Sequence, residues 1–366
     1  MDETKSLVQP KQRTINRMNS VKGDFKEKIF KVVDNGLNAL ALEIFYYQAK
    51  NNPVYSKFLH LIDIRPESII DAVNIPYLPV EFFKNHQVVC TPYNKDIPNT
   101  LEIRKDESLS SPNIGNMTVF TSSSTTGTGV AKHYVPDLDI YHQSLVNSFE
   151  LHFGKPEDFT FRFLLPSYLE RGGSSLVYMA NYLLKLSGKG GFYINDYKAL
   201  ATDLEKDIHQ ENKVILLGVS FALMDFADAY PMNLSQVTII ETGGMKGRKK
   251  EITRYELHDQ LKEAFKTEKI ASEYGMTELL SQAYSLSHGL FTCPPWMRLS
   301  IRSTTDPFAK ETQGKTGGIN IMDLANIDSC CFLATSDLGR QMDNGCFEVL
   351  GRFDNSDIRG CSLLAV

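Results

Sequence analysis

The sequence lacks an excess of basic residues. Its 366 residues include 39 Lys and Arg against 44 Asp and Glu, which gives a formal net charge of -5 at pH 7. A chain of this charge offers no broad positive face, so nucleic acid and anionic membrane surfaces are poor partners for it. The composition is otherwise typical of a globular protein, with 42% hydrophobic and 23% charged residues.

Long apolar segments are missing as well. No apolar run reaches the roughly 18 residues that a membrane-spanning helix needs. The opening segment MDETKSLVQPKQRT contains no apolar stretch of the kind that forms a secretory signal. We therefore expect a cytoplasmic protein, and its 366 residues are enough for two or three subdomains.

Cysteine is sparse and shows no metal-binding spacing. The six cysteines are Cys90, Cys293, Cys330, Cys331, Cys346 and Cys361. They include no CxxC pair, and a zinc site built from Cys293, Cys330 or Cys331, and Cys346 fits no known ligand spacing. In a cytoplasmic chain of this size we expect reduced thiols. Cys330 and Cys331 lie in a strand pattern, which predicts core positions.

Two common phosphate-binding patterns are absent, and a different loop stands in the chain. Neither GxxxxGK[ST] nor a GxGxxG that opens a helix occurs. Instead, TSSSTTGTG at residues 121–129 holds seven hydroxyl residues and two glycines. Glycines let a loop turn its N–H groups toward one point and hydroxyls add rotatable donors, which suits a polyphosphate. A solvated surface loop is the alternative, and the loop alone does not decide between them.

Strand and helix signals alternate in the middle of the chain. Strands are predicted at residues 159–166, 213–219 and 236–244, the last of which runs into a glycine turn. Helices are predicted at residues 174–188, opened by Ser174 or Ser175 and closed near Gly188, and at residues 249–265. This alternation predicts an α/β fold in which helices cover a largely parallel sheet.

The two ends of the chain have other patterns. Apolar residues at helical spacing predict one helix over residues 29–50, and shorter helices follow it up to about residue 86. Past Trp296 the pattern changes to short strands and turns. We expect a large domain over residues 1–350 with a helical N-terminal portion over about residues 1–90, then a hinge and short tail at residues 351–366.

Three short motifs follow the hydroxyl-rich loop. SEYGMTEL, residues 272–279, puts Tyr274 and Glu278 on one turn after a strand predicted at residues 269–271. An aromatic ring can stack on a nucleobase, and a carboxylate can hold Mg²⁺ against phosphates. ATSDLGR contains Asp337, whose carboxylate can accept both hydroxyls of a ribose, and GRFDNSDIRG places Arg352 near a turn.

In this order, the motifs resemble the signatures of the adenylate-forming superfamily of acyl-CoA synthetases, peptide-synthetase adenylation domains and luciferases. The superfamily has a Ser/Thr/Gly phosphate loop, then YGxTE, TxDxG and GRxDD. Here the four read TSSSTTGTG, YGMTE, TSDLG and GRFDN. One short motif recurs by chance, but four in the correct order are specific. The resemblance implies the α/β large domain of that superfamily, with ATP and Mg²⁺.

The resemblance also implies roles for individual residues. The loop would cradle the β- and γ-phosphates, and the glycines of ETGGMKG would lie beside the adenine. The implied ATP-binding residues are Thr121, Ser122, Ser123, Ser124, Thr125, Thr126, Gly127, Gly243, Gly244, Tyr274, Gly275, Thr277, Asp337 and Arg352.

Each of the four motif side chains has an alternative role. Glu278, the implied catalytic Mg²⁺ ligand, could instead cap or salt-bridge a turn. Tyr274 could be an ordinary buried aromatic, Asp337 a turn residue and Arg352 a solvated charge.

Several positions depart from the superfamily pattern. Ser124 replaces the first glycine of SSGTTG, and Val130 stands at the place of the usual lysine, two residues before Lys132. Asn355 replaces the second Asp of GRxDD. Only 12 residues follow Asp354, so we expect no C-terminal lid domain of the kind that most of the superfamily carries.

One branch of the superfamily ends at this point. LLPSYLERGGSSLVYM, PPWMR and RGCSLL resemble the acyl-protein synthetases of the bioluminescence fatty acid reductase complex, whose nearest relatives with a lid are phenylacetate–CoA ligases. That resemblance implies that Cys361 accepts the acyl group as a thioester. Arg359 would favour its thiolate, whereas a buried free cysteine is inert. Weaker candidates for the acyl pocket are Tyr168, Ser174 and Phe221.

These features together predict a function and leave two alternatives. The prediction is AMP-forming activation of a fatty or other carboxylic acid with ATP and Mg²⁺. The acyl group then moves to Cys361 for delivery to a partner, such as an acyl-CoA-reductase-like protein or an acyl carrier. The first alternative is a lidless acyl- or aryl-CoA ligase. The second is a subunit that binds nucleotide or acyl groups without turnover.

Overall fold

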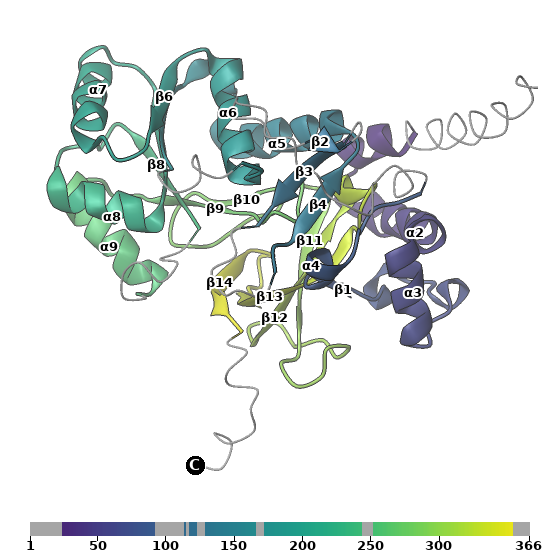
Figure 1. Ribbon diagram of the computed structural model, residues 1–366. Coiled ribbons are helices and arrows are strands. Elements are labelled where there is room, and N and C mark those ends of the chain that lie inside the picture. The colour runs from purple at the N-terminus through teal and green to yellow at the C-terminus, as the bar shows by residue number, and fades with distance from the viewer. Residues whose placement is uncertain are drawn as a thin grey trace, which may run out of the picture.

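The computed structural model describes residues 24–91, 113–114, 117–122, 129–165, 172–243 and 252–353. These residues form sheets of six, five and three strands with helices packed around them (Figure 1). The mixed α/β architecture is the one predicted from the alternating strand and helix signals. None of the described helices is both long and apolar enough to cross a membrane.

The six-stranded sheet is largely parallel, as predicted, and follows the order β10-β9-β8-β7-β5-β6. Its parallel strands are β5 Thr160–Leu164, β6 Gly190–Tyr193, β7 Val214–Val219, β8 Thr238–Thr242 and β9 Ala271–Tyr274, and β10 Ala283–Ser285 pairs antiparallel to β9. Every residue of β7 is buried. A strand covered on both faces needs such a continuous apolar run, so the sequence signal here was strong.

The helices of this region are α5 Leu138–Phe153, α6 Ser175–Ser187, α7 Tyr197–His209, α8 Ser220–Ala229 and α9 Arg254–Phe265. Helix α6 confirms its predicted ends: Ser174 is the N-cap, and Gly188 closes the helix at a φ of 67°. Helix α9 begins later than predicted. Thr253 and Glu256 form a capping box there, which stabilises a start at Arg254.

The other two sheets contain the remaining strands. The three-stranded sheet consists of β2 Asn113–Ile114, β3 Met117–Thr121 and β4 Lys132–Val135, so the hydroxyl-rich segment connects β3 to β4. The five-stranded sheet consists of β1 Leu78–Pro79, β11 Met297–Arg302, β12 Thr316–Asp323, β13 Phe332–Gln341 and β14 Phe347–Arg352. Short strands and turns after Trp296 are thus confirmed.

The single helix predicted over residues 29–50 is wrong. Residues 24–31 form one helix, and α2 Asp34–Asn51 begins after a break. Val33 is the extended N-cap of α2 and is 69% exposed, so no core contact holds it in a continuous helix. Asp34, an acidic residue in the first turn of α2, favours a helix start at this point.

Short helices follow α2, as expected. They are α3 Pro53–Leu61, the 3₁₀ turns η1 Pro66–Ser68 and η2 Ala72–Asn74, and α4 Phe82–Asn85. Further 3₁₀ turns lie at η4 Pro156–Asp158 and η5 Leu324–Asn326.

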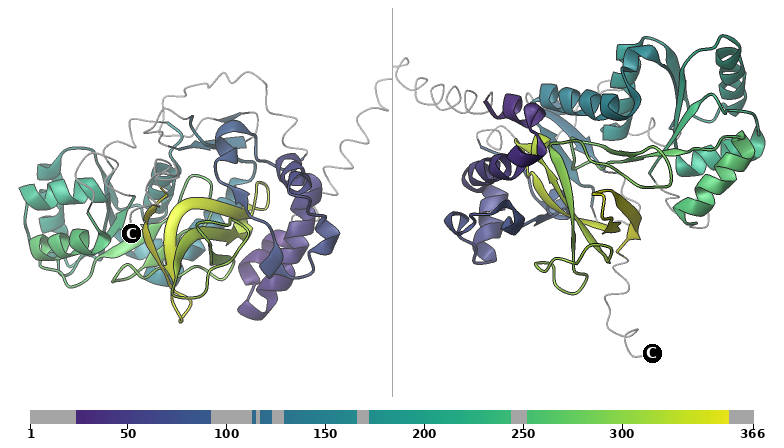
Figure 2. Two further views of the ribbon diagram at one scale, coloured as in Figure 1. Left: turned by 90° about the horizontal axis from the view of Figure 1, so that it is seen from below. Right: turned by 180° about the vertical axis from the view of Figure 1, so that it is seen from behind.

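Helix α2 lies beside the C-terminal strands, far away in the sequence (Figure 2). The buried side chain of Gln48 makes this connection. Its Nε2 donates to the carbonyls of Asn326 and Ile327 at 2.9 and 3.1 Å, and its Oε1 accepts from the Cys331 amide at 2.9 Å. Cys330 and Cys331 are fully buried, which confirms them as core residues.

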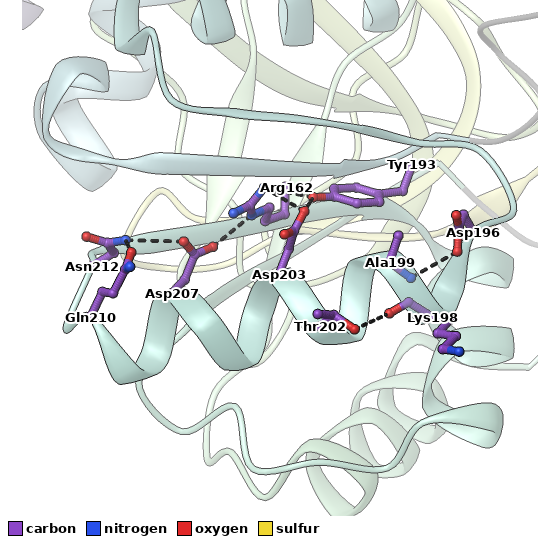
Figure 3. Close-up of polar contacts among 10 residues, drawn as sticks. All are labelled: Arg162, Tyr193, Asp196, Lys198, Ala199, Thr202, Asp203, Asp207, Gln210 and Asn212. Atoms are coloured by element: carbon purple, nitrogen blue, oxygen red, sulfur yellow. Dashed lines mark hydrogen bonds and ion pairs between the residues drawn. The ribbon is translucent and has the colours of Figure 1, made fainter.

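A polar network fastens α7 to the parallel sheet (Figure 3). Arg162 of β5 donates through Nε to Asp207 Oδ2 at 2.7 Å and through an Nη to Tyr193 Oη at 2.7 Å and Asp203 Oδ2 at 3.2 Å. The Asp207 side chain is 4% exposed and that of Asp203 is 40% exposed. The buried member of the pair therefore carries most of the electrostatic attachment.

We expect Asp207→Ala to lower the free energy of unfolding by about 3 kcal/mol, since it leaves the enclosed Arg162 guanidinium short of its buried partner. Asp203→Ala, the matched control in the same helix, should cost under about 1 kcal/mol because water screens that pair. Urea denaturation of both variants measures the two effects. Equal losses of unfolding free energy in the two variants would show that the buried ion pair of Asp207 is no stronger than the exposed pair of Asp203.

Candidate active site

Three of the four sequence motifs meet at the junction of the two large sheets. Tyr274, the last residue of β9, donates through its hydroxyl to Asp337 Oδ2 at 2.8 Å. Arg352 at the end of β14 forms an ion pair with Asp337 Oδ1 at 3.1 Å. Asp337 and Arg352 are direct partners in the β13–β14 register. Asp337 is therefore the point at which YGMTE, TSDLG and GRFDN join.

The Tyr274 ring is enclosed by other aromatic rings. It lies edge-on to Phe291 and Phe347, with ring centroids 5.9 and 5.7 Å away. Burial and the nearby Asp337 carboxylate raise the pKa of the Tyr274 phenol, so its hydroxyl stays a neutral donor. These contacts fix the orientation of the ring, while its stacking on adenine stays a prediction.

Glu278 lies close to the same charged group. Its side chain is buried, and this burial raises the pKa of its carboxyl to about 7. The charges of Asp337 and Glu81 raise this pKa further, and Arg352 opposes them. The Glu278 carbonyl accepts from Asn326 Nδ2 at 2.8 Å, which holds the turn in place. A buried carboxylate with other acids nearby attracts a cation.

The donor set suits Mg²⁺ bound together with phosphates. Within the described ranges no three His, Cys, Asp or Glu side chains form a metal cage. Mg²⁺ is usually held by one or two carboxylates plus substrate phosphates and water, so a cage is not required. Glu278 fits the role of the single protein carboxylate.

Glu81, next to this group, was missed in the sequence. It is the N-cap of the four-residue helix α4, and Ser336 of the TSDLG motif donates to its Oε1 at 2.5 Å. The half-buried Arg302 lies within electrostatic reach of both Glu81 and Asp337. Glu81 stands in no motif, so only the approach of α4 to β13 identifies it.

His133 is a second residue that the sequence left unassigned. It lies on β4, just after the hydroxyl-rich segment, and its Nδ1 is 2.8 Å from the carbonyl oxygen of Thr277 in YGMTE. The ring is buried and packs edge-on to Phe83. Burial lowers the pKa of His133 to about 4, so the neutral ring donates from Nδ1. His133 thus connects the strand that leaves the hydroxyl-rich segment to the turn that carries Glu278.

Two hydroxyl residues at the start of the loop have structural partners. Thr121 donates its amide to the Gly173 carbonyl at 2.7 Å, and its hydroxyl lies 3.4 Å from the Gly172 carbonyl. Ser122 Oγ accepts from the Ala131 amide at 3.0 Å. The rest of the predicted phosphate-binding stretch, Ser123, Ser124, Thr125, Thr126 and Gly127, lies outside the described residues.

The other predicted positions are placed as follows. Gly243 directly follows β8 and has a φ of 73°, a conformation that favours glycine and fits the predicted turn. Ser174 caps α6, and Phe221 is buried in α8. Gly275 and Thr277 lie on the turn after β9, which begins later than the strand predicted at residues 269–271. Gly244, Tyr168 and Cys361 lie outside the described residues.

Comparison with known proteins identifies the fold. No family model and no curated protein matches the sequence. A 2-hydroxyisobutyryl-CoA ligase in complex with 2-HIB-AMP and CoA matches with a TM-score of 0.62 at 11% identity, over 90% of this chain and 72% of the ligase. The same ligase in the thioesterification state matches with a TM-score of 0.62 at 12% identity, over 90% and 71%.

A second protein, solved with bound ATP, shares part of the fold. An ATP-bound RpMatB-BxBclM chimera matches with a TM-score of 0.50 at 16% identity, over 64% of this chain and 47% of the chimera. This chain therefore spans about half the length of the chimera. At such identities the likeness shows the fold alone, and it confirms the predicted α/β fold. It does not test the predicted resemblance to the acyl-protein synthetases.

The low pKa of His133 makes a pH-dependent contribution to stability. Because the folded-state pKa of about 4 lies below the ordinary value of 6.5, the unfolded chain binds the proton first as pH falls. The wild type should therefore lose about 2 kcal/mol through His133 between pH 7 and pH 5. His133→Asn keeps a donor for the Thr277 carbonyl but does not titrate. Between pH 7 and pH 5 the variant should therefore lose about 2 kcal/mol less of its free energy of unfolding than the wild type.

Urea denaturation at both pH values measures this difference, and the other titrating groups cancel between the two proteins. Parallel pH profiles for the wild type and His133→Asn would contradict a buried, neutral His133.

Proposed function

We propose that this chain is an ATP-dependent ligase that activates a carboxylic acid as an acyl-adenylate. The observation that carries the proposal is the convergence of Tyr274 and Arg352 on the Asp337 carboxylate, with Glu278 close by. They come from separate motifs, and they meet on a fold shared with the ATP-bound chimera and with a CoA ligase in complex with 2-HIB-AMP.

The reaction needs activation because a carboxylate is a poor electrophile. A substrate carboxylate oxygen attacks the α-phosphorus of ATP, the bond to the β-phosphate breaks, and pyrophosphate leaves with the electron pair. Asp337 would accept from the ribose hydroxyls, and Tyr274 and Arg352 hold its carboxylate in place. The hydroxyl-rich segment would donate to the β- and γ-phosphates, where negative charge develops.

Mg²⁺, when bound, neutralises charge on the phosphates. Glu278 would hold it. Burial disfavours the charged form of this carboxyl, and a bound cation would stabilise that form. His133 would keep the backbone of that turn in position through the Thr277 carbonyl.

Cys361 is proposed as the acyl acceptor, and a fatty acid as the substrate. Its thiolate would attack the acyl-AMP carbonyl and expel AMP, which leaves a thioester for a reductase or carrier partner. Support comes from the RGCSLL resemblance alone, because Cys361 lies outside the described residues. The alternative acceptor is CoA, which the matched 2-hydroxyisobutyryl-CoA ligase structure contains.

Isotope exchange between pyrophosphate and ATP tests the adenylation step. We expect exchange that depends on Mg²⁺ and on a carboxylic acid, with a panel of fatty, short and aromatic acids. A chain that binds ATP but supports no acid-dependent exchange with any acid would reject the enzyme and favour the non-catalytic alternative.

Glu278→Gln keeps the side-chain shape and removes the charge, so it should lower acid-dependent exchange by about 10²-fold. Because the pKa of Glu278 is about 7, the wild type should bind MgATP roughly tenfold more tightly at pH 8 than at pH 6, as the carboxylate forms. The variant should lose this pH dependence.

Isothermal titration at both pH values measures the affinities. The matched control is Glu263→Gln, an exposed position on α9, which should retain the wild-type profile. An unchanged exchange rate in Glu278→Gln at saturating Mg²⁺ would remove Glu278 from the site.

Cys361→Ser should still form acyl-AMP but should hold no acyl group, since a hydroxyl is a far weaker nucleophile than a thiol at neutral pH. Labelled acid with ATP, followed by intact-protein mass, should show a hydroxylamine-labile adduct on the wild type. Cys346→Ser, another free thiol, is the control and should retain the adduct. Brisk CoA-dependent turnover without any protein adduct would favour the CoA ligase instead.

A further inference from the structure

The two residues before Gly275 point to opposite faces of β9, because side chains alternate along a strand. Tyr274 faces Asp337, and Ser272 on the same side lies 3.3 Å from His258 Nε2 of α9. Glu273 therefore faces the other side of the sheet, where its carboxyl lies within electrostatic reach of Tyr141 in α5 and Tyr284 in β10. This side of the strand is not used by the nucleotide-binding residues proposed above.

Glu273 is a buried acid without a basic partner in the described part of the chain. It is 7% exposed, and the Thr242 hydroxyl of the neighbouring strand donates to its Oε2. No ion pair of the described residues includes it, and the nearby charge of Glu241 is negative. Burial raises the pKa of the Glu273 carboxyl to about 7.

Glu241 on the neighbouring strand is a buried acid with a structural role, and its contacts can be compared with those of Glu273. Its Oε1 pairs with Arg254 Nε at 2.9 Å and lies 3.5 Å from His258 Nε2, and its Oε2 accepts from Ser220 Oγ at 3.0 Å. Burial raises the pKa of Glu241, but His258 and Arg254 outweigh that effect and lower the pKa to about 2. Among the described residues, one of two neighbouring buried acids is thus neutralised and the other has no cationic partner.

Two further polar atoms beside Glu273 have no partner among the described residues. A Cβ at Gly275 would lie 2.5 Å from Glu273 Oε1 and 3.6 Å from Gln282 Cγ, so both side chains flank the glycine backbone. Gln282 Oε1 and Tyr284 Oη are buried and make no hydrogen bond within the described ranges. Tyr284 is the direct register partner of Glu273. Buried polar atoms of native proteins are nearly always hydrogen-bonded, so these atoms are available to a hydrogen-bonding ligand.

The missing partner is best supplied by a hydrogen-bond donor. The Glu273 carboxylate and Gln282 Oε1 are acceptors, and the Tyr284 hydroxyl both donates and accepts. Glu273 also lies at the start of the turn that carries Glu278, so a molecule that contacts it lies next to the proposed reaction centre. A plain alkyl chain at this place would leave all of these polar atoms unpaired, which is costly.

We propose that Glu273, Gln282 and Tyr284 recognise a hydrogen-bond donor on the acid substrate, so that a carboxylic acid bearing a hydroxyl or amino group is preferred over the plain alkanoic or aryl acid. The inference rests on the proposed function and narrows its substrate class. It turns the expectation of a simple fatty acid into one of a polar-substituted acid.

Matched acids test the preference. Hexanoate is compared with its 2-hydroxy, 6-hydroxy and 6-amino derivatives, and phenylacetate with its 4-hydroxy and 4-amino derivatives, by ATP–pyrophosphate exchange. At least one substituted acid should exceed its parent about tenfold or more in kcat/KM, as expected of a hydrogen bond to a charged group. The 6-hydroxy and 6-amino derivatives of hexanoate show whether the donor is neutral or cationic, because an alkylamine is protonated at neutral pH whereas the arylamine of the phenylacetate series is not.

Three substitutions then test which residues cause the preference for a substituted acid. Glu273→Gln should reduce the preference by about tenfold, and Glu273→Leu should reverse it in favour of the parent acid, because the site becomes apolar. Tyr284→Phe should reduce it less. Glu241→Gln is the matched control on the neighbouring strand, and it should leave the preference ratio unchanged. If Glu273→Leu does not fold, the isosteric Glu273→Gln decides.

The outcomes separate this inference from the proposed function. Equal exchange with parent and substituted acids, or a preference untouched by both Glu273 substitutions, would overturn the inference while adenylation stands. Equilibrium binding of the same acids is measured in parallel in the presence of a non-hydrolysable ATP analogue. Preferential, Glu273-dependent binding without any exchange would support the inference and reject the enzyme. No preference in either assay would overturn the inference.

Discussion

The hydrogen-bonded carboxylate of Asp337 is the contact on which the candidate site depends. It is buried, it accepts from the Tyr274 hydroxyl of the six-stranded sheet, and it pairs with Arg352 on the adjacent strand of the five-stranded sheet. A buried carboxylate is stable only when donors and positive charge surround it. These same requirements hold the two sheets in one relative position, so the architecture and the site share one set of contacts.

The parallel sheet places its chemistry at one edge. The strands β8 and β9 both end at the site, β8 at the turn with Gly243 and β9 at the turn that carries Glu278. Carboxyl ends of parallel strands gather at one edge of a sheet, and ligands of open α/β sheets bind there. The edge also separates two tasks, because alternate residues of β9 face opposite sides. Tyr274 faces the proposed nucleotide, and Glu273 faces the proposed acid.

Glu241 of β8 and Glu273 of β9 are both buried glutamates, but their surroundings differ. Glu241 is surrounded by Arg254, His258 and Ser220, and it fastens α9 to the sheet. Within the described ranges, the hydrogen-bond partner of Glu273 is the Thr242 hydroxyl, and its carboxylate lies against the glycine of the YGMTE turn. A protein gains no stability from an uncompensated buried acid, which is why such groups gather where a ligand binds.

The sequence by itself determined the features that depend on nearby residues. Three features were predictable because each depends on residues close together in the sequence. They are the apolar run of β7, the ends of α6 at Ser174 and Gly188, and the four short motifs. It also determined the α/β class, since alternating periodicities of strands and helices leave few other arrangements. The helix break before Asp34 was missed, because helical spacing continues through a residue that proves to be exposed.

Only the tertiary structure decided which residues without a predicted role join the site. Glu81 and His133 lie far in the sequence from the motif residues that they contact, and Glu273 stands directly before Tyr274. Each becomes notable through a partner on another element, and His133 and Glu273 also through burial. Propensity and spacing describe one segment at a time, whereas desolvation and hydrogen bonding depend on what packs against it. The motifs therefore predicted the side proposed to bind the nucleotide, and the fold alone distinguished Glu241, whose pKa is lowered by nearby cations, from Glu273, whose pKa is raised by burial.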